Sequence, residues 1–169
     1  MVEAVARGLL PSRSRAWIAA YSVLGAAAVI AHRPATRPHG GRTAMWIGIP
    51  LALGGYPLGC ALLGHRPYKR PPDQAALELT ALAAVVAPVE ELTWGRLIEP
   101  RIGIPATAAL FAAKHVAIDG RWRRAAGLGL FWVGLGLVRR RSPLLALGLH
   151  VAANASGVML GHLTGEDRF

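Results

Sequence analysis

Seven ionisable or strongly polar side chains interrupt the apolar stretches of this sequence, and all but the first fall into three short clusters. These residues are Glu78, Glu90, Glu91, Lys114, His115, His150 and Asn154. A glutamate beside a histidine can take a proton from water, and a second histidine beside an asparagine can stabilise an oxyanion. Side chains of these types could therefore hydrolyse an amide bond if the chain brings them together.

Spacing within the clusters limits which side chains can share a site. Glu90 and Glu91 are adjacent, and neighbours on a helix point about 100° apart, so only one of them can point straight into a site. His150 and Asn154 are four residues apart, and that spacing places two side chains on the same face of a helix. We expect one glutamate to act in the site and the other to find its own partner.

Each cluster alone also has a plainer interpretation. The glutamates could mark a helix end that reaches the headgroups, and His115 could be a packed, hydrogen-bonded core residue. His150 and Asn154 could hold two helices together. Lys114 is expected to point away from the site and to extend towards water. The three clusters together favour a shared site, because mutual burial would satisfy their polar groups.

Composition indicates that lipid surrounds the elements that carry these clusters. Hydrophobic residues make up 53% of the chain and charged residues only 17%, whereas soluble domains carry about 25% charged residues. The net charge of +10 comes from basic groups between the apolar stretches, as is typical where loops meet phosphate headgroups. Membrane lipid is therefore the expected partner and nucleic acid is not. The basic groups are Arg33, Arg37 and Arg42; Arg66, Lys69 and Arg70; Arg121, Arg123 and Arg124; and Arg139, Arg140 and Arg141.

Apolar runs of the length of membrane-spanning helices predict an all-α, polytopic transmembrane bundle of about six helices. We expect one membrane-embedded domain over residues 1–169, with the clusters carried by core helices within residues 75–163. Pro105 suits the first turn of the fourth helix, and Ser142 with Pro143 suits the start of the sixth. The expected helices cover residues 16–31, 43–64, 75–94, 104–118, 125–138 and 142–163. A charge at the bilayer centre costs about 2.5–3.5 kcal/mol, which makes polar residues in these helices functional candidates.

Three motifs in order resemble the CPBP family of intramembrane proteases. They are Glu-Glu followed by an arginine, then Phe-x-x-x-His, then His-x-x-x-Asn, and they occupy roughly residues 88–157. The family includes type II CAAX prenyl endopeptidases and bacteriocin-processing or immunity proteins. The resemblance implies a multi-pass protein of a bacterial-type plasma membrane that cleaves a peptide or protein near the membrane surface. A lipidated C-terminal tail is one such substrate.

The resemblance also implies roles for individual residues. Glu90 matches the glutamate that activates water together with His115. His150 and Asn154 match the pair that binds the oxyanion. Glu91 matches a carboxylate that supports the site together with an arginine.

That arginine departs from the family pattern, which is Glu-Glu-x-x-x-Arg. Gly95 stands where the arginine is expected, and Arg96 follows one residue later, which turns it by about 100° on a regular helix. Either a local bulge restores the direction of Arg96, or another group takes its role. We include Arg96 among the predicted catalytic residues.

Alternative mechanisms and functions remain open at this point. His115 and His150 with Glu90 could bind zinc and leave a position for water, although their spacing is not a known zinc signature. The metal-free mechanism is slightly favoured. The chain could also be an inactive family member with a binding or bacteriocin-immunity role. Two further alternatives are a proton or cation relay and a scaffold whose polar residues scatter to different faces.

Overall fold

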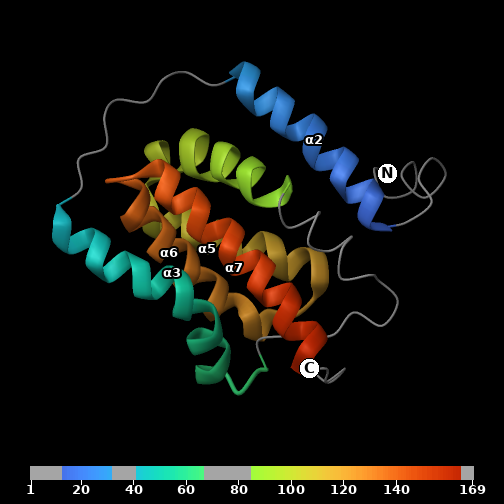
Figure 1. Cartoon of the computed structure of the whole chain (residues 1–169), viewed down its shortest axis with the longest axis vertical. Helices are drawn as coiled ribbons and strands as arrows, with labels where there is room; N and C mark the ends of the chain where they lie inside the picture. The colour runs from blue at the N-terminus through green and yellow to red at the C-terminus, as the bar shows by residue number, and fades with distance from the viewer. Residues whose placement is uncertain (1–12, 32–40, 67–84, 165–169) are drawn as a thin grey trace.

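Every regular element in the described parts of the chain is a helix, which confirms the predicted all-α class. The computed structural model describes residues 13–31, 41–66 and 85–164 (Figure 1). A helical segment over residues 85–90 continues into a π-helix, η1 (Glu91–Ile98), and then into α5 (Glu99–Asp119). Glu78 and the first part of the predicted third helix lie outside the described residues. The elements are α2 (Arg13–Ala31), α3 (Arg42–Leu62), η1 (Glu91–Ile98), α5 (Glu99–Asp119), η2 (Trp122–Arg124), α6 (Ala125–Arg139) and α7 (Pro143–Thr164).

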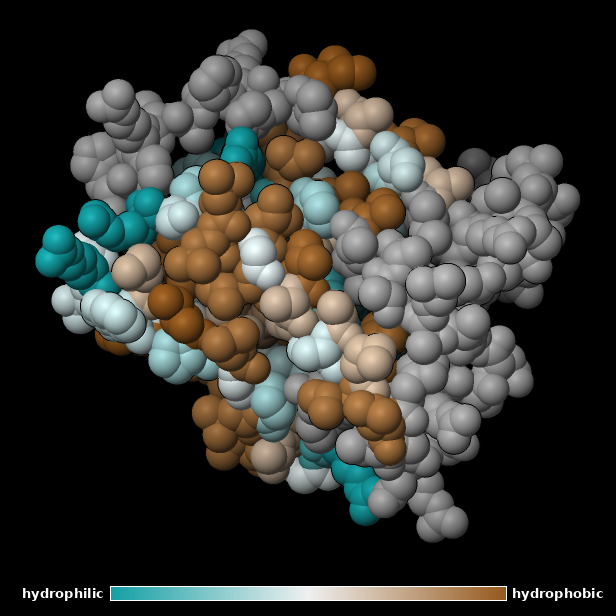
Figure 2. Space-filling view, in the orientation of Figure 1, coloured by the Kyte–Doolittle hydropathy of each residue, from teal (hydrophilic) through white to brown (hydrophobic). Residues whose placement is uncertain are grey.

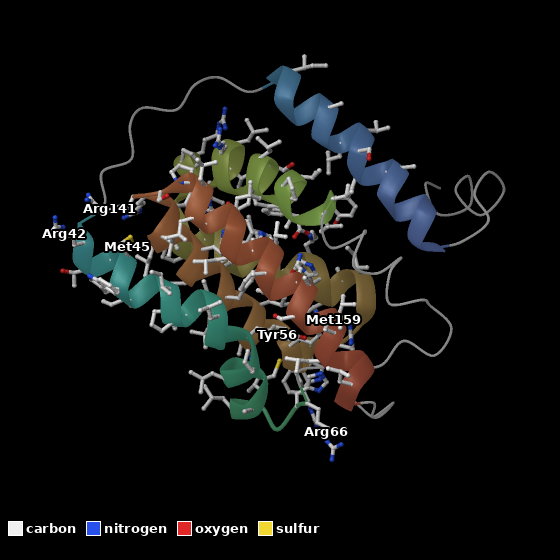
Figure 3. All side chains as sticks on the ribbon, in the orientation of Figure 1. Arg42, Met45, Tyr56, Arg66, Arg141 and Met159 are labelled. Atoms are coloured by element: carbon white, nitrogen blue, oxygen red, sulfur yellow. The ribbon has the colours of Figure 1, made fainter. Side chains whose placement is uncertain are left out.

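Two helices among the described residues are long and apolar enough to cross a membrane. They are Arg42–Leu62, which is α3, and Pro143–Gly161, which is most of α7. Hydrophobic side chains gather over the middle of the face drawn in Figure 2, with hydrophilic residues towards its edges. Figure 3 places Arg42 at one end of α3 and Arg66 beyond the other end. This pattern suits an apolar belt between two polar surfaces, whereas the number of membrane crossings stays a prediction.

Helices α3 and α6 approach each other so closely that only glycine fits at several contact positions. A Cβ atom on Gly134 would lie 2.3 Å from the backbone nitrogen of Ala52. A Cβ atom on Gly127 would lie 2.4 Å from the carbonyl oxygen of Tyr56, and one on Gly59 would lie 2.3 Å from the nitrogen of Gly127. Small residues of this kind let helix backbones pack together without a need for large side chains. The glycine-rich sequence of α6 is thus the means by which it packs on α3.

A sharp break divides α5 at the position where a new helix was expected to begin. Gly103 has φ 81° and ψ 165°, a left-handed region that favours glycine. Helical geometry resumes at Ile104, so Pro105 lies in a first turn, as predicted. The Thr107 hydroxyl donates to the carbonyl oxygen of Gly103 at 2.8 Å and closes the break. The 85–98 segment and the second half of α5 can therefore run in different directions.

The predicted start of the last helix is also confirmed. The backbone N–H of Leu145 donates to Ser142 Oγ at 3.2 Å, and Pro143 is the first residue of α7. This is the geometry of an N-cap followed by proline in the first turn. Helix α6 runs to Arg139, one residue beyond the predicted range.

Candidate active site

Three of the predicted catalytic residues converge in the interior, although they come from three different helical segments. Glu90 ends the segment that precedes η1, His115 lies on α5 and His150 on α7. His150 Nε2 is 3.5 Å from Glu90 Oε2, and His115 Nε2 is 3.9 Å from Glu90 Oε1. Glu90 is 3% exposed and His150 only 1%. The scaffold alternative requires these three side chains to lie on different faces, and the structure instead brings them together.

Hydrogen bonds fix how the two imidazoles face Glu90. His115 Nδ1 is 2.9 Å from the carbonyl oxygen of Phe111. A carbonyl only accepts, so this nitrogen carries the proton, and Nε2 of a neutral ring has a free lone pair. His150 Nδ1 likewise donates to Glu91 Oε1 at 3.0 Å. Both rings thus turn Nε2 towards Glu90, His115 towards Oε1 and His150 towards Oε2.

Aromatic rings surround the two histidines. Phe111 lies 4.5 Å from the His115 ring and stacks on Trp132 at 4.2 Å, both between ring centroids. Phe131 meets His150 edge-on at 5.1 Å. Trp132, Phe111 and Phe131 are buried. Low-polarity walls of this kind strengthen electrostatic interactions among the groups that they enclose.

Glu91, the second carboxylate, has a partner that the sequence did not predict. Arg139 on α6 donates to it twice, from Nε to Oε2 at 2.7 Å and from Nη2 to Oε1 at 2.9 Å. A third donor, Arg139 Nη1, bonds Glu99 Oε2 at 2.5 Å. The guanidinium also lies 4.8 Å from the ring centroid of Trp132. A buried bidentate pair of this type holds a carboxylate in one orientation.

The prediction that Arg96 supports the site needs correction. A π-helix is present over η1, yet the side chain of Arg96 is exposed. Gly95 instead faces the site: a Cβ atom on it would lie 2.5 Å from Arg139 Nε and 2.7 Å from Arg139 Cζ. The guanidinium beside Glu91 therefore comes from α6 and not from η1.

Two further partners of Glu90 were not predicted. Lys114 Nζ bonds Glu90 Oε1, which corrects the expectation that this side chain points away from the site. The Tyr21 hydroxyl, from α2, donates to the same oxygen at 3.4 Å. Helix α2 lies close to the 85–90 segment because Gly25, one turn after Tyr21, leaves room for the side chain of Val89. A Cβ atom on Gly25 would be 2.8 Å from Val89 Cγ2. The charge of Lys114 was visible in the sequence, whereas nothing distinguished Tyr21.

Asn154 lies one turn beyond His150 on α7 and is half-buried. Its side chain makes no hydrogen bond within the residues that the structure describes. The predicted pairing of His150 with Asn154 on one helix face agrees with their positions on an unbroken helix.

The zinc alternative, with His115, His150 and Glu90 as ligands, stays a prediction. Within residues 13–31, 41–66 and 85–164, no group of three His, Cys, Asp or Glu side chains is arranged to hold a metal ion. The ammonium group of Lys114 lies on Glu90 Oε1 and would repel a cation at that oxygen.

Comparison of the chain with models of protein families, with curated proteins and with solved structures found no match. The resemblance to CPBP proteases therefore stays a prediction based on the three motifs.

Proposed function

We propose that this chain is an intramembrane endopeptidase of the CPBP type, which hydrolyses a peptide bond with water activated by Glu90 and His115. The observation that carries this proposal is a buried carboxylate that faces the Nε2 atoms of two histidines from different helices. Buried charge without a partner or a task is too costly to keep in an apolar interior.

Glu90 acts as the base in this mechanism. A water molecule that hydrogen-bonds both Glu90 Oε1 and His115 Nε2 gives its proton to the carboxylate while its oxygen attacks the peptide carbonyl carbon. The bond from His115 Nδ1 to Phe111 keeps Nε2 available as an acceptor. Glu90 then passes the proton to the leaving amine nitrogen as the C–N bond breaks. A positioned base of this kind contributes about 10²–10⁴-fold in rate.

His150 and Asn154 stabilise the oxyanion that forms on the attacked carbonyl. His150 donates through Nδ1 to Glu91, so it needs the imidazolium form to donate through Nε2 as well. The amide of Asn154 supplies a second donor from one turn further along the same helix face. Each such donor is worth about 10²–10³-fold in kcat.

The proposed mechanism uses no metal ion. The zinc alternative assigns His115, His150 and Glu90 as ligands, but the ammonium group of Lys114 bonds Glu90 Oε1, the oxygen that faces His115. Metal analysis and chelation distinguish the two mechanisms.

The proposed substrate is a peptide or protein segment near the membrane surface, and a CAAX-type C-terminal tail is one form of it. We place the enzyme as a multi-pass protein in a bacterial-type plasma membrane, in contact with lipid. The two helices that are long and apolar enough to span a bilayer support this location.

A catalytically inactive protein with a binding or bacteriocin-immunity role is the second candidate. The bond from Lys114 to Glu90 favours it, because a carboxylate that is paired with an ammonium group is a weaker base.

Cleavage of a broad peptide panel by the purified protein in liposomes tests the proposal. The wild type should cleave at least one peptide, and Glu90→Ala and His150→Ala should each lose that activity. Ser156→Ala is a matched control, since Ser156 is exposed on α7 and its hydroxyl, among the described residues, donates to the Ala153 carbonyl oxygen. If the wild type cleaves nothing, the inactive alternative replaces the enzyme.

A further inference from the structure

We infer that Arg139 is the positioning residue of this site, and that it supplies from α6 a guanidinium that helix η1 lacks at position 95. The effect of Arg139 on the rate of cleavage rests on the proposed endopeptidase function. Its structural consequence, the orientation of Glu91 and His150, can be measured without any activity.

The charge arrangement shows how fully Arg139 is committed to this site. The residue is 6% exposed and lies between two buried carboxylates, Glu91 and Glu99. Removal of one partner from a buried ion pair leaves an uncompensated charge, which is strongly destabilising. Here the loss of one arginine would leave two such carboxylates, so Arg139 is not a peripheral salt bridge.

The connection to the catalytic histidine runs through one carboxylate. Glu91 Oε1 accepts from Arg139 Nη2 at 2.9 Å and from His150 Nδ1 at 3.0 Å. Arg139 therefore fixes the rotamer of Glu91, and Glu91 fixes the tautomer and ring direction of His150. Outer partners that orient metal-binding histidines contribute about 10–100-fold to activity, and we expect an effect of that order for His150.

Position 95 explains why the guanidinium can come from another helix. Gly95 follows Glu91 by four residues, a spacing that places two side chains on the same helix face. A Cβ atom at this position would lie 2.5 Å from Arg139 Nε. An arginine at 95 and Arg139 would thus occupy the same volume and serve the same carboxylate. The chain can hold one of them but not both.

A swap of the arginine between the two positions tests this inference. Arg139→Ala should lower kcat about 10–100-fold with KM within about twofold, because Arg139 orients His150 without touching substrate. Gly95→Arg alone should also have a lower kcat than the wild type, because the new side chain would clash with Arg139. The double variant Gly95→Arg/Arg139→Ala should recover at least about tenfold in kcat over Arg139→Ala.

Arg140→Ala is the matched control, because Arg140 is the next residue along and is exposed. Arg139→Lys keeps the charge but loses the planar fork, so its kcat should lie between those of the wild type and Arg139→Ala. If Arg139→Ala fails to fold while the double variant folds, the shared role of the two positions is supported.

Nitrogen-15 NMR of labelled histidine in the full chain separates this inference from the proposed function. The His150 signals, assigned by their loss in His150→Ala, should report a protonated Nδ1 in the wild type. They should shift in Arg139→Ala and return in the double variant. If the wild type cleaves no peptide but the signals follow this pattern, the endopeptidase proposal fails and Arg139 stands as the positioning residue. The inference is overturned if Arg139→Ala keeps both kcat and the His150 signals, or if the folded double variant recovers neither.

Discussion

Lys114 Nζ bonds Glu90 Oε1, the same carboxylate oxygen that faces His115 Nε2 at 3.9 Å. The ammonium compensates a carboxylate that is 3% exposed, and in a low-dielectric interior such compensation is worth far more than at a surface. The two residues adjacent in sequence, Lys114 and His115, therefore both serve Glu90. The lysine stabilises the charge of Glu90, and in the proposed mechanism the histidine helps to hold the water.

Replacement of Lys114 should make the protein less stable. Lys114→Met leaves Glu90 with one fewer donor, and a hydrogen bond to a charged group contributes about 1.5–3 kcal/mol. Lys114→Arg keeps the charge and should cost less. The free energy of unfolding in detergent micelles measures both effects, and a Lys114→Met variant as stable as the wild type would show that the ion pair is unimportant.

Asn154 should matter for catalysis and little for stability. Asn154→Ala removes one oxyanion donor and should lower kcat about 10²–10³-fold. The Asn154 amide is half-buried and has no hydrogen bond among the residues that the structure describes. The melting temperature of the Asn154→Ala variant should therefore stay near that of the wild type. Steady-state kinetics and thermal unfolding measure these quantities. Unchanged kcat in Asn154→Ala would remove this residue from the mechanism.

The contact between α3 and α6 should tolerate nothing larger than glycine at its closest points. Gly134→Ala would place a Cβ atom 2.3 Å from the Ala52 nitrogen, so the backbones must separate. Overpacking of this kind costs about 1–3 kcal/mol. Gly129→Ala, on the same helix, has nothing within 4 Å of its new Cβ atom and is the control. Equal melting temperatures of the two variants would contradict the described packing.

Removal of metal ions should leave cleavage unchanged. The proposed mechanism uses a glutamate, two histidines and an asparagine, so a strong chelator should not lower kcat in liposomes, and metal analysis should find no stoichiometric zinc. Loss of activity on chelation, followed by recovery with added zinc, would instead assign Glu90, His115 and His150 as ligands and displace the metal-free mechanism.

Two helix starts could be predicted because local residues determine them, whereas the predicted end of the third helix near Trp94 was wrong, because helical structure continues through η1 into α5. Ser142 and Pro143 specify the start of α7, and the break at Gly103 precedes a helical run with Pro105 in its first turn. Glu90, His115 and His150 could be identified because buried polar groups in an apolar chain need one another. These signals require no knowledge of how distant helices pack.

The partners of the site residues could not be predicted in the same way. Arg139 belongs to a basic run between apolar stretches and has the same sequence context as exposed Arg140. Arg139 reaches Glu91 from the end of α6 because its side chain occupies the space left by the missing side chain at Gly95. Arg96 was the nearer choice in sequence, but its direction on η1 keeps it exposed.

Cleavage in oxygen-18 water tests the central claim, that Glu90 activates water against a peptide carbonyl. With a cleavable peptide in liposomes, the wild type should yield fragments whose new C-terminal carboxyl carries one heavy oxygen, as mass spectrometry can detect. Glu90→Gln, which keeps the shape of the side chain but removes the base, should lose at least about 10²-fold in rate. A Glu90→Gln variant that cleaves and incorporates label at the wild-type rate would contradict the proposed role of Glu90.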